Sequence, residues 1–308
     1  MKNNAPKIVV VGSSNMDLVV KSKRIPAAGE TILGGDFIMA PGGKGANQAV
    51  AAAKLGANVC FIAKLGEDVF GEQSLKNFKK ERVNTDYVQK THEAPSGVAL
   101  IMVDDKGENS IVVAPGANLK LSPADVRAAE TEIAAAGAVV AQLEVPLDTI
   151  QCAAELANSS NVPFVLDPAP ARELPPELLE MVDVLTPNET EAQILTGIEV
   201  TDEDSARAAS KNLLERGVKA VIVTLASKGF LLVDSDQVVY VPAHKVQAVD
   251  STAAGDAFTG SLAVGIAEGK PLLDAASFAN YVAALAVTKM GAQSSMPTLQ
   301  EVQSFVSS

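Results

Sequence analysis

The sequence predicts an α/β protein of three layers, with helices on both faces of a mainly parallel central sheet. Short β-branched runs recur along the 308 residues, they are apolar at nearly every position, and an amphipathic or Ala-rich segment follows most of them. Parallel strands covered on both faces have such continuous apolar runs, and alternation with helices builds this architecture. Because no repeat or linker divides the chain, we expect a single domain over residues 1–308.

The individual elements follow from the same patterns. Strands are expected at 7–11, 59–63, 139–143, 164–166, 182–185 and 220–224. Helices are expected at 45–55, 70–82, 201–216 and 257–267, and from Pro123 onward. The boundaries carry helix signals, because Ser122 precedes Pro123 and because Gly56 and Gly217 follow helical segments.

Two stretches without a helical pattern, 18–40 and 97–113, interrupt the alternation. The first holds strand-like pieces separated by proline and glycine, and the second has two apolar runs around the hairpin sequence DDKGEN. We expect them to form a small second sheet, a lid that covers a site and excludes water. The alternative is an ordinary surface hairpin.

Composition excludes several classes of function. Hydrophobic residues make up 47%, yet no run is long enough to span a membrane. The net charge is -12 and there is no basic stripe, so we expect no nucleic-acid partner. The two cysteines, Cys60 and Cys152, lie in apolar runs and cannot form a disulfide framework, which predicts a reduced, cytoplasmic location.

The motif with the most specific chemistry is DSTAAGD, residues 250–256, at the start of an apolar helix. Small residues there allow a ligand to approach the free backbone N–H groups, which form an anion hole with the helix dipole; Ala253, Ala254 and Gly255 would supply it. Asp256 is placed to accept a proton from an attacking hydroxyl. This pairing suits phosphoryl transfer. Alternatively, Asp256 only caps the helix.

Three further motifs follow expected strands or precede expected helices. GSSNMD places Asn15 and Asp17 after the first strand, where an amide and a carboxylate can bind sugar hydroxyls. PGGKGANQ combines adjacent glycines, which permit close backbone approach, with Lys44 and Asn47 as donors. TPNETE offers Asn188 and Glu191 to a hydrated Mg²⁺. For each motif, a capped turn or helix without a ligand is the alternative.

Taken in order, GSSNMD, PGGKGANQA, TPNETE, TLASKG and DSTAAGDAFTG resemble the phosphofructokinase-B sugar kinases along essentially the whole chain. The resemblance implies an α/β sandwich with a β-sheet lid, and a homodimer that pairs through the lids. It implies ATP-dependent phosphorylation of D-ribose at its 5-hydroxyl, with Mg²⁺ and a monovalent cation, usually K⁺.

By position, the resemblance implies that Asp256 is the base that activates the sugar hydroxyl. Implied sugar contacts are Asn15, Asp17, Gly42, Gly43, Lys44, Asn47 and Glu144. Implied nucleotide contacts are Asn188, Thr224, Ser227, Gly229, Gly255 and Asn280. Glu191 corresponds to the acid associated with Mg²⁺. The implied K⁺ site comprises Asp250, Thr252, Ala286, Lys289, Gly291 and Ser295.

The chain departs from the family's D-T-x-G-A-G-D pattern at two positions. Ser251 replaces threonine and keeps the hydroxyl, whereas Ala253 replaces the first glycine and adds a methyl group. We therefore expect Ala253 to have a negative φ.

Other activities stay open at this point. The acceptor could be 2-deoxyribose, fructose or adenosine, although Asp17 and Asn47 can hold a vicinal diol and no aromatic cluster suggests a site for a base. A sugar-binding protein without catalysis is a different class, as is a purely structural domain. Asp256, Gly255, Asn188 and Glu191 are all present, which favours the enzyme.

Overall fold

The structure is a computed structural model that describes residues 5–307. Nine strands form the main sheet in the order β13-β12-β11-β10-β9-β8-β1-β4-β5. They are β1 (Lys7–Val11), β4 (Asn58–Gly66), β5 (Val88–Thr91), β8 (Ala138–Gln142), β9 (Phe164–Asp167), β10 (Val184–Leu185), β11 (Ala220–Thr224), β12 (Gly229–Asp234) and β13 (Val238–Pro242). All neighbours from β11 to β5 pair in parallel, and only β12 runs the opposite way, antiparallel to both β11 and β13. The mainly parallel sheet is thus confirmed, although β10 is shorter than expected.

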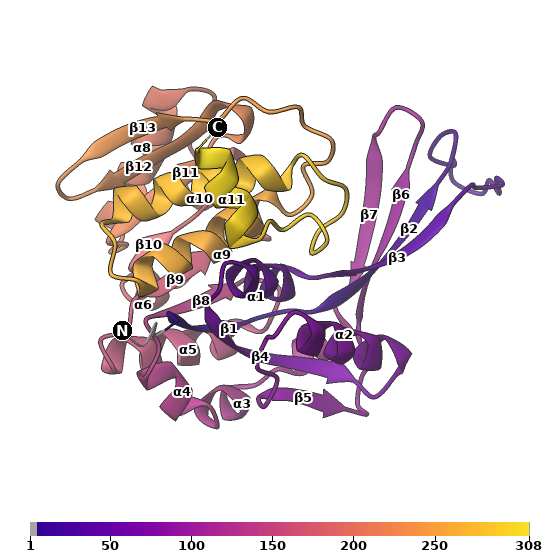
Figure 1. The fold of residues 1–308 in the computed structure, drawn as a ribbon, viewed down its shortest axis with the longest axis horizontal. Helices are drawn as coiled ribbons and strands as arrows, with labels where there is room; N and C mark the ends of the chain where they lie inside the picture. Colours follow the sequence, from indigo (N-terminus) through magenta and orange to yellow (C-terminus); the bar gives the residue numbers. More distant parts are fainter. Residues whose placement is uncertain (1–4, 308) are drawn as a thin grey trace.

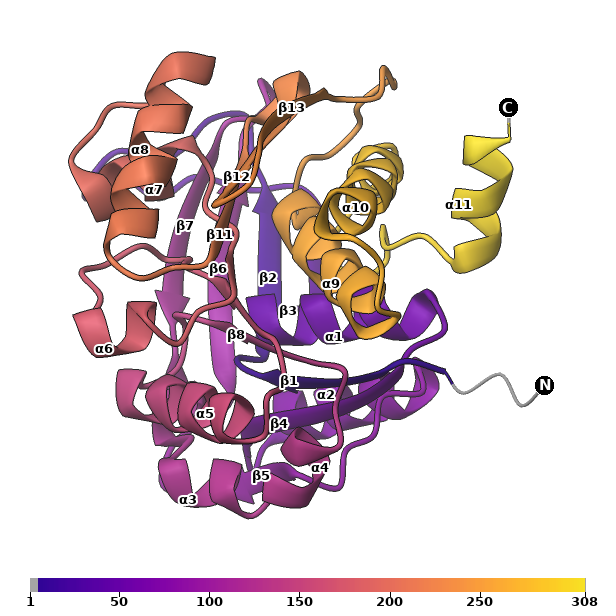
Figure 2. The ribbon, with the colours of Figure 1, turned by 90° about the vertical axis from the view of Figure 1, so that its left-hand side faces the viewer.

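Helices cover both faces of this sheet, which confirms the three layers (Figures 1 and 2). One face packs against α3 (Pro123–Arg127), α4 (Glu130–Ala134), α5 (Leu147–Ser159), α6 (Pro176–Leu179), α7 (Glu189–Thr196) and α8 (Glu203–Glu215). The other packs against α1 (Lys44–Lys54), α2 (Val69–Lys80), α9 (Ala254–Ala267), α10 (Leu272–Ala286) and α11 (Leu299–Val306).

The residues of β1 show how the sequence divides the core. Val9 and Val11 lie in the first of these two apolar clusters, and Ile8 and Val10 lie in the second. Successive strand side chains point to opposite faces, so a continuous apolar run serves both layers of helices. Ser122 caps α3 in a reciprocal capping box with Asp125, as the sequence indicated.

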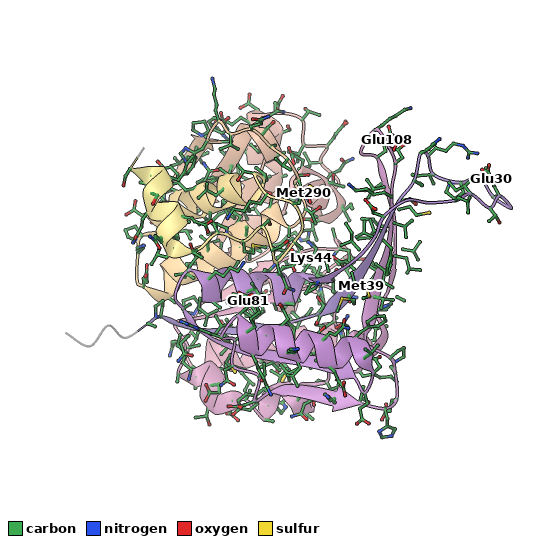
Figure 3. The ribbon with its side chains drawn as sticks, turned by 45° about the vertical axis from the view of Figure 1, so that its right-hand side comes forward. Glu30, Met39, Lys44, Glu81, Glu108 and Met290 are labelled. Atoms are coloured by element: carbon green, nitrogen blue, oxygen red, sulfur yellow. The ribbon has the colours of Figure 1, made fainter. Side chains whose placement is uncertain are left out.

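A separate four-stranded sheet projects from this body (Figure 1). Its order is β3-β2-β6-β7, from β2 (Asn15–Lys21), β3 (Phe37–Gly42), β6 (Gly97–Val103) and β7 (Asn109–Ala114). We call it the second sheet. It begins at Asn15 and β3 ends at Gly42, outside the expected segment 18–40, so it includes three of the predicted sugar contacts, Asn15, Asp17 and Gly42. Lys44 lies where the sheet leaves the body, whereas Glu30 and Glu108 lie toward its far end (Figure 3).

Two short 3-10 helices complete the description: η1 (Gly116–Lys120) follows β7, and η2 (Ala226–Lys228) joins β11 to β12. Within residues 5–307 no helix is both long and apolar enough to cross a membrane.

Candidate active site

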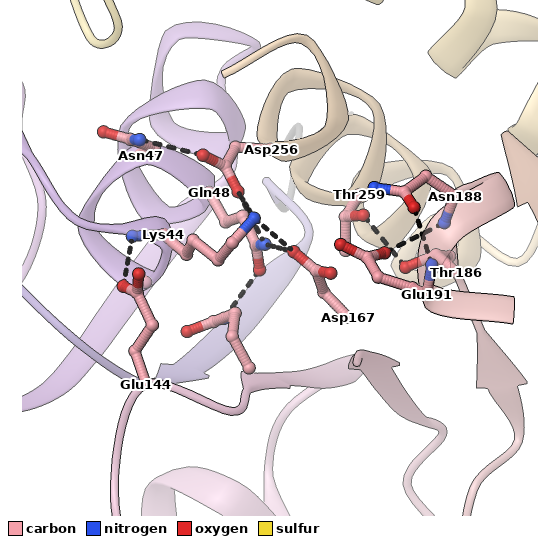
Figure 4. Close-up of polar contacts among 12 residues, drawn as sticks. Lys44, Asn47, Gln48, Glu144, Asp167, Thr186, Asn188, Glu191, Asp256 and Thr259 are labelled. Atoms are coloured by element: carbon pink, nitrogen blue, oxygen red, sulfur yellow. Dashed lines mark hydrogen bonds and ion pairs between the residues drawn. The ribbon is translucent and has the colours of Figure 1, made fainter. Parts of the chain in front are cut away.

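The polar side chains singled out in the sequence gather at the carboxyl ends of the parallel strands. Glu144 follows β8, Asp167 ends β9, and Asn188 follows β10. Lys44, in the first turn of α1, and Asp256, in the first turn of α9, face them (Figure 4). This edge of a parallel sheet is where the helix N-termini also lie, so backbone N–H groups and side chains converge there.

Asp256 is held by α1. It is 4% exposed, and each of its carboxylate oxygens accepts a hydrogen bond, from Asn47 Nδ2 at 2.8 Å and from Gln48 Nε2 at 3.1 Å. Lys44 Nζ lies 3.9 Å from it. Asn47 Oδ1 is buried and has no hydrogen-bond partner among the described residues. A buried acceptor without a partner costs free energy unless a ligand supplies the donor, and a sugar hydroxyl is such a donor.

Asp167 is a member of the site that the sequence analysis missed. It is 4% exposed, accepts a hydrogen bond from Gln48 Nε2 at 2.8 Å, and lies 3.7 Å from Lys44 Nζ. Burial raises the pKa of Asp167, and the nearby Lys44 ammonium opposes that rise. A carboxylate directly after an apolar strand, as in VLDP, was the signal that could have found it.

Lys44 is the positive charge among these acids. Burial would lower the pKa of its ammonium, but Asp167, Asp256 and Glu144 outweigh burial and raise it, so Lys44 stays charged. A charged ammonium can donate hydrogen bonds, and the role of Lys44 as a donor to a ligand stays a prediction.

The glycines of PGGKG are required by close packing against the start of the second sheet. A Cβ on Gly42 would lie 2.3 Å from Asp17 Oδ2, and one on Gly43 would lie 2.6 Å from the backbone nitrogen of Asn15. Gly43 also has a φ of 88°, which L side chains rarely adopt. The two glycines therefore bring the Asp17 carboxylate and the α1 N-terminus together.

Glu144 connects β8 to α1. Its Oε2 accepts a hydrogen bond of 3.0 Å from the backbone N–H of Lys44 and another from the Ser13 hydroxyl. It therefore satisfies an otherwise free N–H of α1, for which the N-cap residue Gly43 has no side chain. Burial, with smaller contributions from Glu144 and Asp256, raises the pKa of Asp17 to about 7.

The N-terminus of α9 differs from expectation at Ala253. This residue is the N-cap and has φ 59° and ψ 17°, in the left-handed region, so the expected negative φ is wrong. The chain must turn there to enter the helix, and this turn dictates a glycine-like conformation that the alanine has to adopt. Such a conformation costs a non-glycine residue ~1–2 kcal/mol.

The backbone donors of this turn are partly used. Ala254 N–H donates to Ser251 O at 3.2 Å, so the anion hole predicted from Ala253, Ala254 and Gly255 lacks a free Ala254 donor in this conformation. Within the described chain, the N–H groups of Ala253, Gly255 and Asp256 have no acceptor. A Cβ on Gly255 would meet no atom within 4 Å, so the surface of α9 is open on that side.

The other residues predicted to contact nucleotide lie at the start of α7, between the end of β11 and the start of β12, and in α10. Asn188 caps α7 through a reciprocal capping box with Glu191, and a β-bridge links Asn188 to Thr224 at the end of β11. Asn280, in α10, donates from Nδ2 to Pro242 O at 2.9 Å, at the end of β13. Ser227 is exposed in η2, and Gly229 begins β12 with a φ of 114°.

The predicted K⁺ residues lie before α9, at the end of α10 and in the loop that follows α10, and Asp250 connects these segments. Its Oδ1 accepts from Thr252 N–H at 2.9 Å, and its Oδ2 accepts from Gly291 N–H at 2.8 Å. Burial would raise the pKa of Asp250, but these hydrogen bonds outweigh it and lower the pKa, so the carboxylate is ionised. Lys289 pairs with Glu301 at 2.5 Å. Ala286 O accepts from Lys289 N–H, and the Ser295 hydroxyl donates to Ala292 O.

Residues 5–307 contain no group of three or more His, Cys, Asp or Glu side chains arranged to hold a metal ion.

Comparison with known proteins identifies the fold and family. The profile of the pfkB family carbohydrate kinases matches residues 5–299. A ribokinase of Haemophilus influenzae is 43% identical over 97% of this chain and 98% of its own length, and a deoxyribokinase of Salmonella typhi is 40% identical over 97% and 98%. The structure of Arabidopsis thaliana ribokinase complexed with ribose and ATP superimposes with a TM-score of 0.91, at 36% identity over 98% of this chain and 99% of that one.

These similarities extend over nearly the whole chain, including every motif of the candidate site. The chain therefore belongs to the pfkB family of carbohydrate kinases.

Proposed function

We propose that this kinase phosphorylates D-ribose at its 5-hydroxyl with ATP, giving ribose 5-phosphate and ADP. The observation that carries the proposal is the position of Asp256: its carboxylate lies in the helical turn whose N–H groups at Ala253, Gly255 and Asp256 have no acceptor in the described chain. A base beside an anion-binding helix start is what transfer of a phosphoryl group to a hydroxyl requires.

The sugar would lie between α1 and the start of the second sheet. Asp17 and Glu144 supply acceptors, Lys44 and Asn15 supply donors, and Asn47 has its unpartnered buried Oδ1. Gly42 and Gly43 keep this space free of side chains. An acceptor set of this kind favours a polyhydroxylated substrate, and the second sheet would act as a lid over it.

In the proposed reaction, Asp256 removes the proton from the 5-hydroxyl as that oxygen attacks the γ-phosphorus. The new O–P bond forms while the bond to the bridging oxygen of the β-phosphate breaks, so ADP leaves with the electron pair. The free N–H groups and the Lys44 ammonium stabilise the charge on the transferred group. Asn47 and Gln48 keep the Asp256 carboxylate in place through the attack.

Family membership implies ATP with a divalent metal, and Glu191 and Asn188 offer oxygen ligands of the kind that a hydrated Mg²⁺ prefers. Mg²⁺ there would neutralise phosphate charge. The ionised Asp250, with Thr252 and the segment 286–295, fits a monovalent cation, since Val287 O lies 3.1 Å from the backbone nitrogen of Asp250 and Lys289 is paired with Glu301. K⁺ there would stabilise the turn at the start of α9. The nucleotide would be bound by Thr224, Ser227, Gly229 and Asn280.

We also propose a homodimer that forms through the second sheets. Large apolar side chains are exposed on one face of β3, β6 and β7, including Phe37, Met39, Leu100 and Val112, and Val112 is 64% exposed. An apolar patch of this extent on one sheet is typical of a protein interface. The proposed location is the cytoplasm, where the buried thiols of Cys60 and Cys152 stay reduced.

A second candidate substrate is 2-deoxyribose, because a deoxyribokinase is nearly as similar as the ribokinases. The test is ADP release with a panel of ribose, 2-deoxyribose, fructose and adenosine, each with ATP and Mg²⁺, with and without K⁺. We expect the highest kcat/KM for ribose and a higher rate with K⁺. A higher kcat/KM for another acceptor would overturn the ribose assignment, and sugar binding without ADP release would indicate a non-catalytic protein.

A further inference from the structure

Two buried asparagine amides form a chain of hydrogen bonds at the base of the second sheet. The backbone N–H of Ser14 donates to Asn118 Oδ1 at 2.9 Å, and Asn118 Nδ2 donates to Asn15 Oδ1 at 2.7 Å. Asn118 is 1% exposed and Asn15 is 4% exposed. Asn118 lies in η1, 103 residues away from Asn15 in sequence, and was not among the predicted site residues.

The donors fix the orientation of both amides. A backbone N–H can only donate, so the Asn118 atom that faces Ser14 must be its oxygen. Its NH₂ group then faces Asn15, and the Asn15 atom that receives it must also be an oxygen. Asn15 is left with Nδ2 pointing away from Asn118, and this group has no protein acceptor among residues 5–307.

The two amides pack directly against Gly97, which has no side chain. Gly97 begins β6 and is the direct strand partner of Asn15. A Cβ there would lie 2.2 Å from Asn15 Oδ1 and 2.4 Å from Asn118 Nδ2. Gly97 has no positive φ, so the close approach of these amides, rather than its backbone conformation, explains the glycine.

The hydrogen bonds of Asn118 also connect strands of the second sheet. They lie at its base, where the strands leave the body (Figure 1). Asn15 pairs with Gly42 at the end of β3 and with Gly97 at the start of β6, and Asn118 follows the end of β7. The base of all four strands is therefore linked to the orientation of a single side-chain amide.

We propose that Asn118 is a positioning residue that makes Asn15 present a hydrogen-bond donor to the sugar, and so contributes to the choice of substrate. This inference rests on the proposed function, since it takes Asn15 to face the sugar. A donor held in this way recognises a hydroxyl that accepts a hydrogen bond, and a sugar without that hydroxyl leaves the amide unpaired.

The test is Asn118→Asp. One carboxylate oxygen still accepts from Ser14, but the other cannot donate to Asn15, so the Asn15 amide turns and presents its oxygen to the sugar. We expect the KM and the Kd for ribose to rise about tenfold, with the KM for ATP unchanged. The increase should be smallest for the mono-deoxyribose that lacks the hydroxyl opposite Asn15. An equal increase for ribose and every mono-deoxyribose would overturn the inference.

A double-mutant cycle separates positioning from a general structural effect. In an Asn15→Ala background, Asn118→Asp should leave ribose KM and Kd unchanged, because Asn118 acts only through Asn15. The same tenfold increase in that background would contradict the proposal. Asn118→Leu, which keeps the volume and removes both hydrogen bonds, replaces Asn118→Asp if thermal unfolding shows that the acidic variant does not fold.

The wild-type protein distinguishes this inference from the proposed function. If the wild type phosphorylates ribose and Asn118→Asp changes nothing, only the inference fails. If another sugar in the panel is the better substrate, the ribose assignment fails, and the same cycle with that sugar and its deoxy forms still decides the role of Asn118.

Discussion

Gln48 donates a hydrogen bond of 3.1 Å to Asp256 across 208 residues of sequence, and the same Nε2 lies 2.8 Å from Asp167. One amide thus connects two buried carboxylates. Ionised carboxylates only accept hydrogen bonds, so Gln48 presents its NH₂ group to both, and its Oε1 accepts from Gln142 Nε2 at 2.6 Å. The network therefore extends from the proposed base into the central sheet, and it makes the position of Asp256 depend on residues that touch no substrate.

Replacement of the proposed base tests its role directly. In Asp256→Asn we expect kcat to fall at least about a hundredfold with the sugar still bound, because the amide cannot take a proton. Its NH₂ group would also face one of the two donors, Asn47 or Gln48. Asp274→Asn, at an exposed position in the first turn of α10, is the control. Single-turnover phosphorylation rates are the measurement, and near-normal turnover in Asp256→Asn would refute the assignment.

Gln48→Met keeps the length of the side chain but removes the donor from both carboxylates. We expect kcat to fall about tenfold and the free energy of unfolding to fall by ~1–3 kcal/mol, the cost of leaving buried groups unpaired. Urea unfolding and steady-state kinetics measure the two effects. Gln73→Met, exposed on α2, should change neither. An unchanged kcat in Gln48→Met would show that the network does not position Asp256.

The sugar affinity should depend on pH through Asp17. Burial raises the pKa of Asp17 to about 7, so its carboxylate is protonated below that pH and loses acceptor capacity. We expect the KM for the sugar to rise as the pH falls from 8 to 6, and Asp17→Asn to remove this dependence. A pH-independent KM in the wild type would contradict the prediction.

The same shift has a consequence for stability. A folded-state pKa above the unfolded value means that the folded protein binds more protons, so the contribution of Asp17 to stability decreases as the pH rises from about 4 to 7. Asp17→Asn should therefore be more stable than the wild type at pH 8, with a smaller difference at pH 4. Thermal unfolding at the two pH values checks this.

Ala253→Gly should stabilise the protein. Glycine adopts the left-handed conformation without the cost that alanine bears, and this gain of ~1–2 kcal/mol exceeds the ~0.5–1 kcal/mol that glycine loses in chain entropy. We expect the Tm to rise by about 2 °C. Ala254→Gly, inside α9 one residue later, should lower it. A lower Tm for Ala253→Gly would show that the turn does not strain the alanine.

Charge on the exposed face of the second sheet should disrupt the proposed dimer. Val112→Glu places a carboxylate within the apolar patch, and we expect the protein to elute as a monomer in size-exclusion chromatography coupled to light scattering. Ile194→Glu changes an exposed apolar residue on α7 and should leave the mass unchanged. A wild-type protein that is monomeric at micromolar concentration would contradict the dimer.

The sequence by itself determined the architecture and the main residues of the site. Apolar runs such as 7–11 and 220–224 became strands because burial on both faces demands continuous hydrophobicity, and Ser122 capped its helix through contacts only three residues away. The motif 250–256 likewise placed Asp256 at a helix start, because small residues and a carboxylate act locally there.

Only the tertiary structure decided which distant groups support that site. Asp167, Gln48 and Asn118 make their decisive contacts over 103 to 208 residues, and no local periodicity encodes such pairs. Residue preferences likewise could not predict the left-handed conformation of Ala253. The path by which the chain enters α9 sets that φ, and the alanine has to adopt it. Short-range forces select helices and strands, whereas the packing of layers selects the partners of each buried polar group.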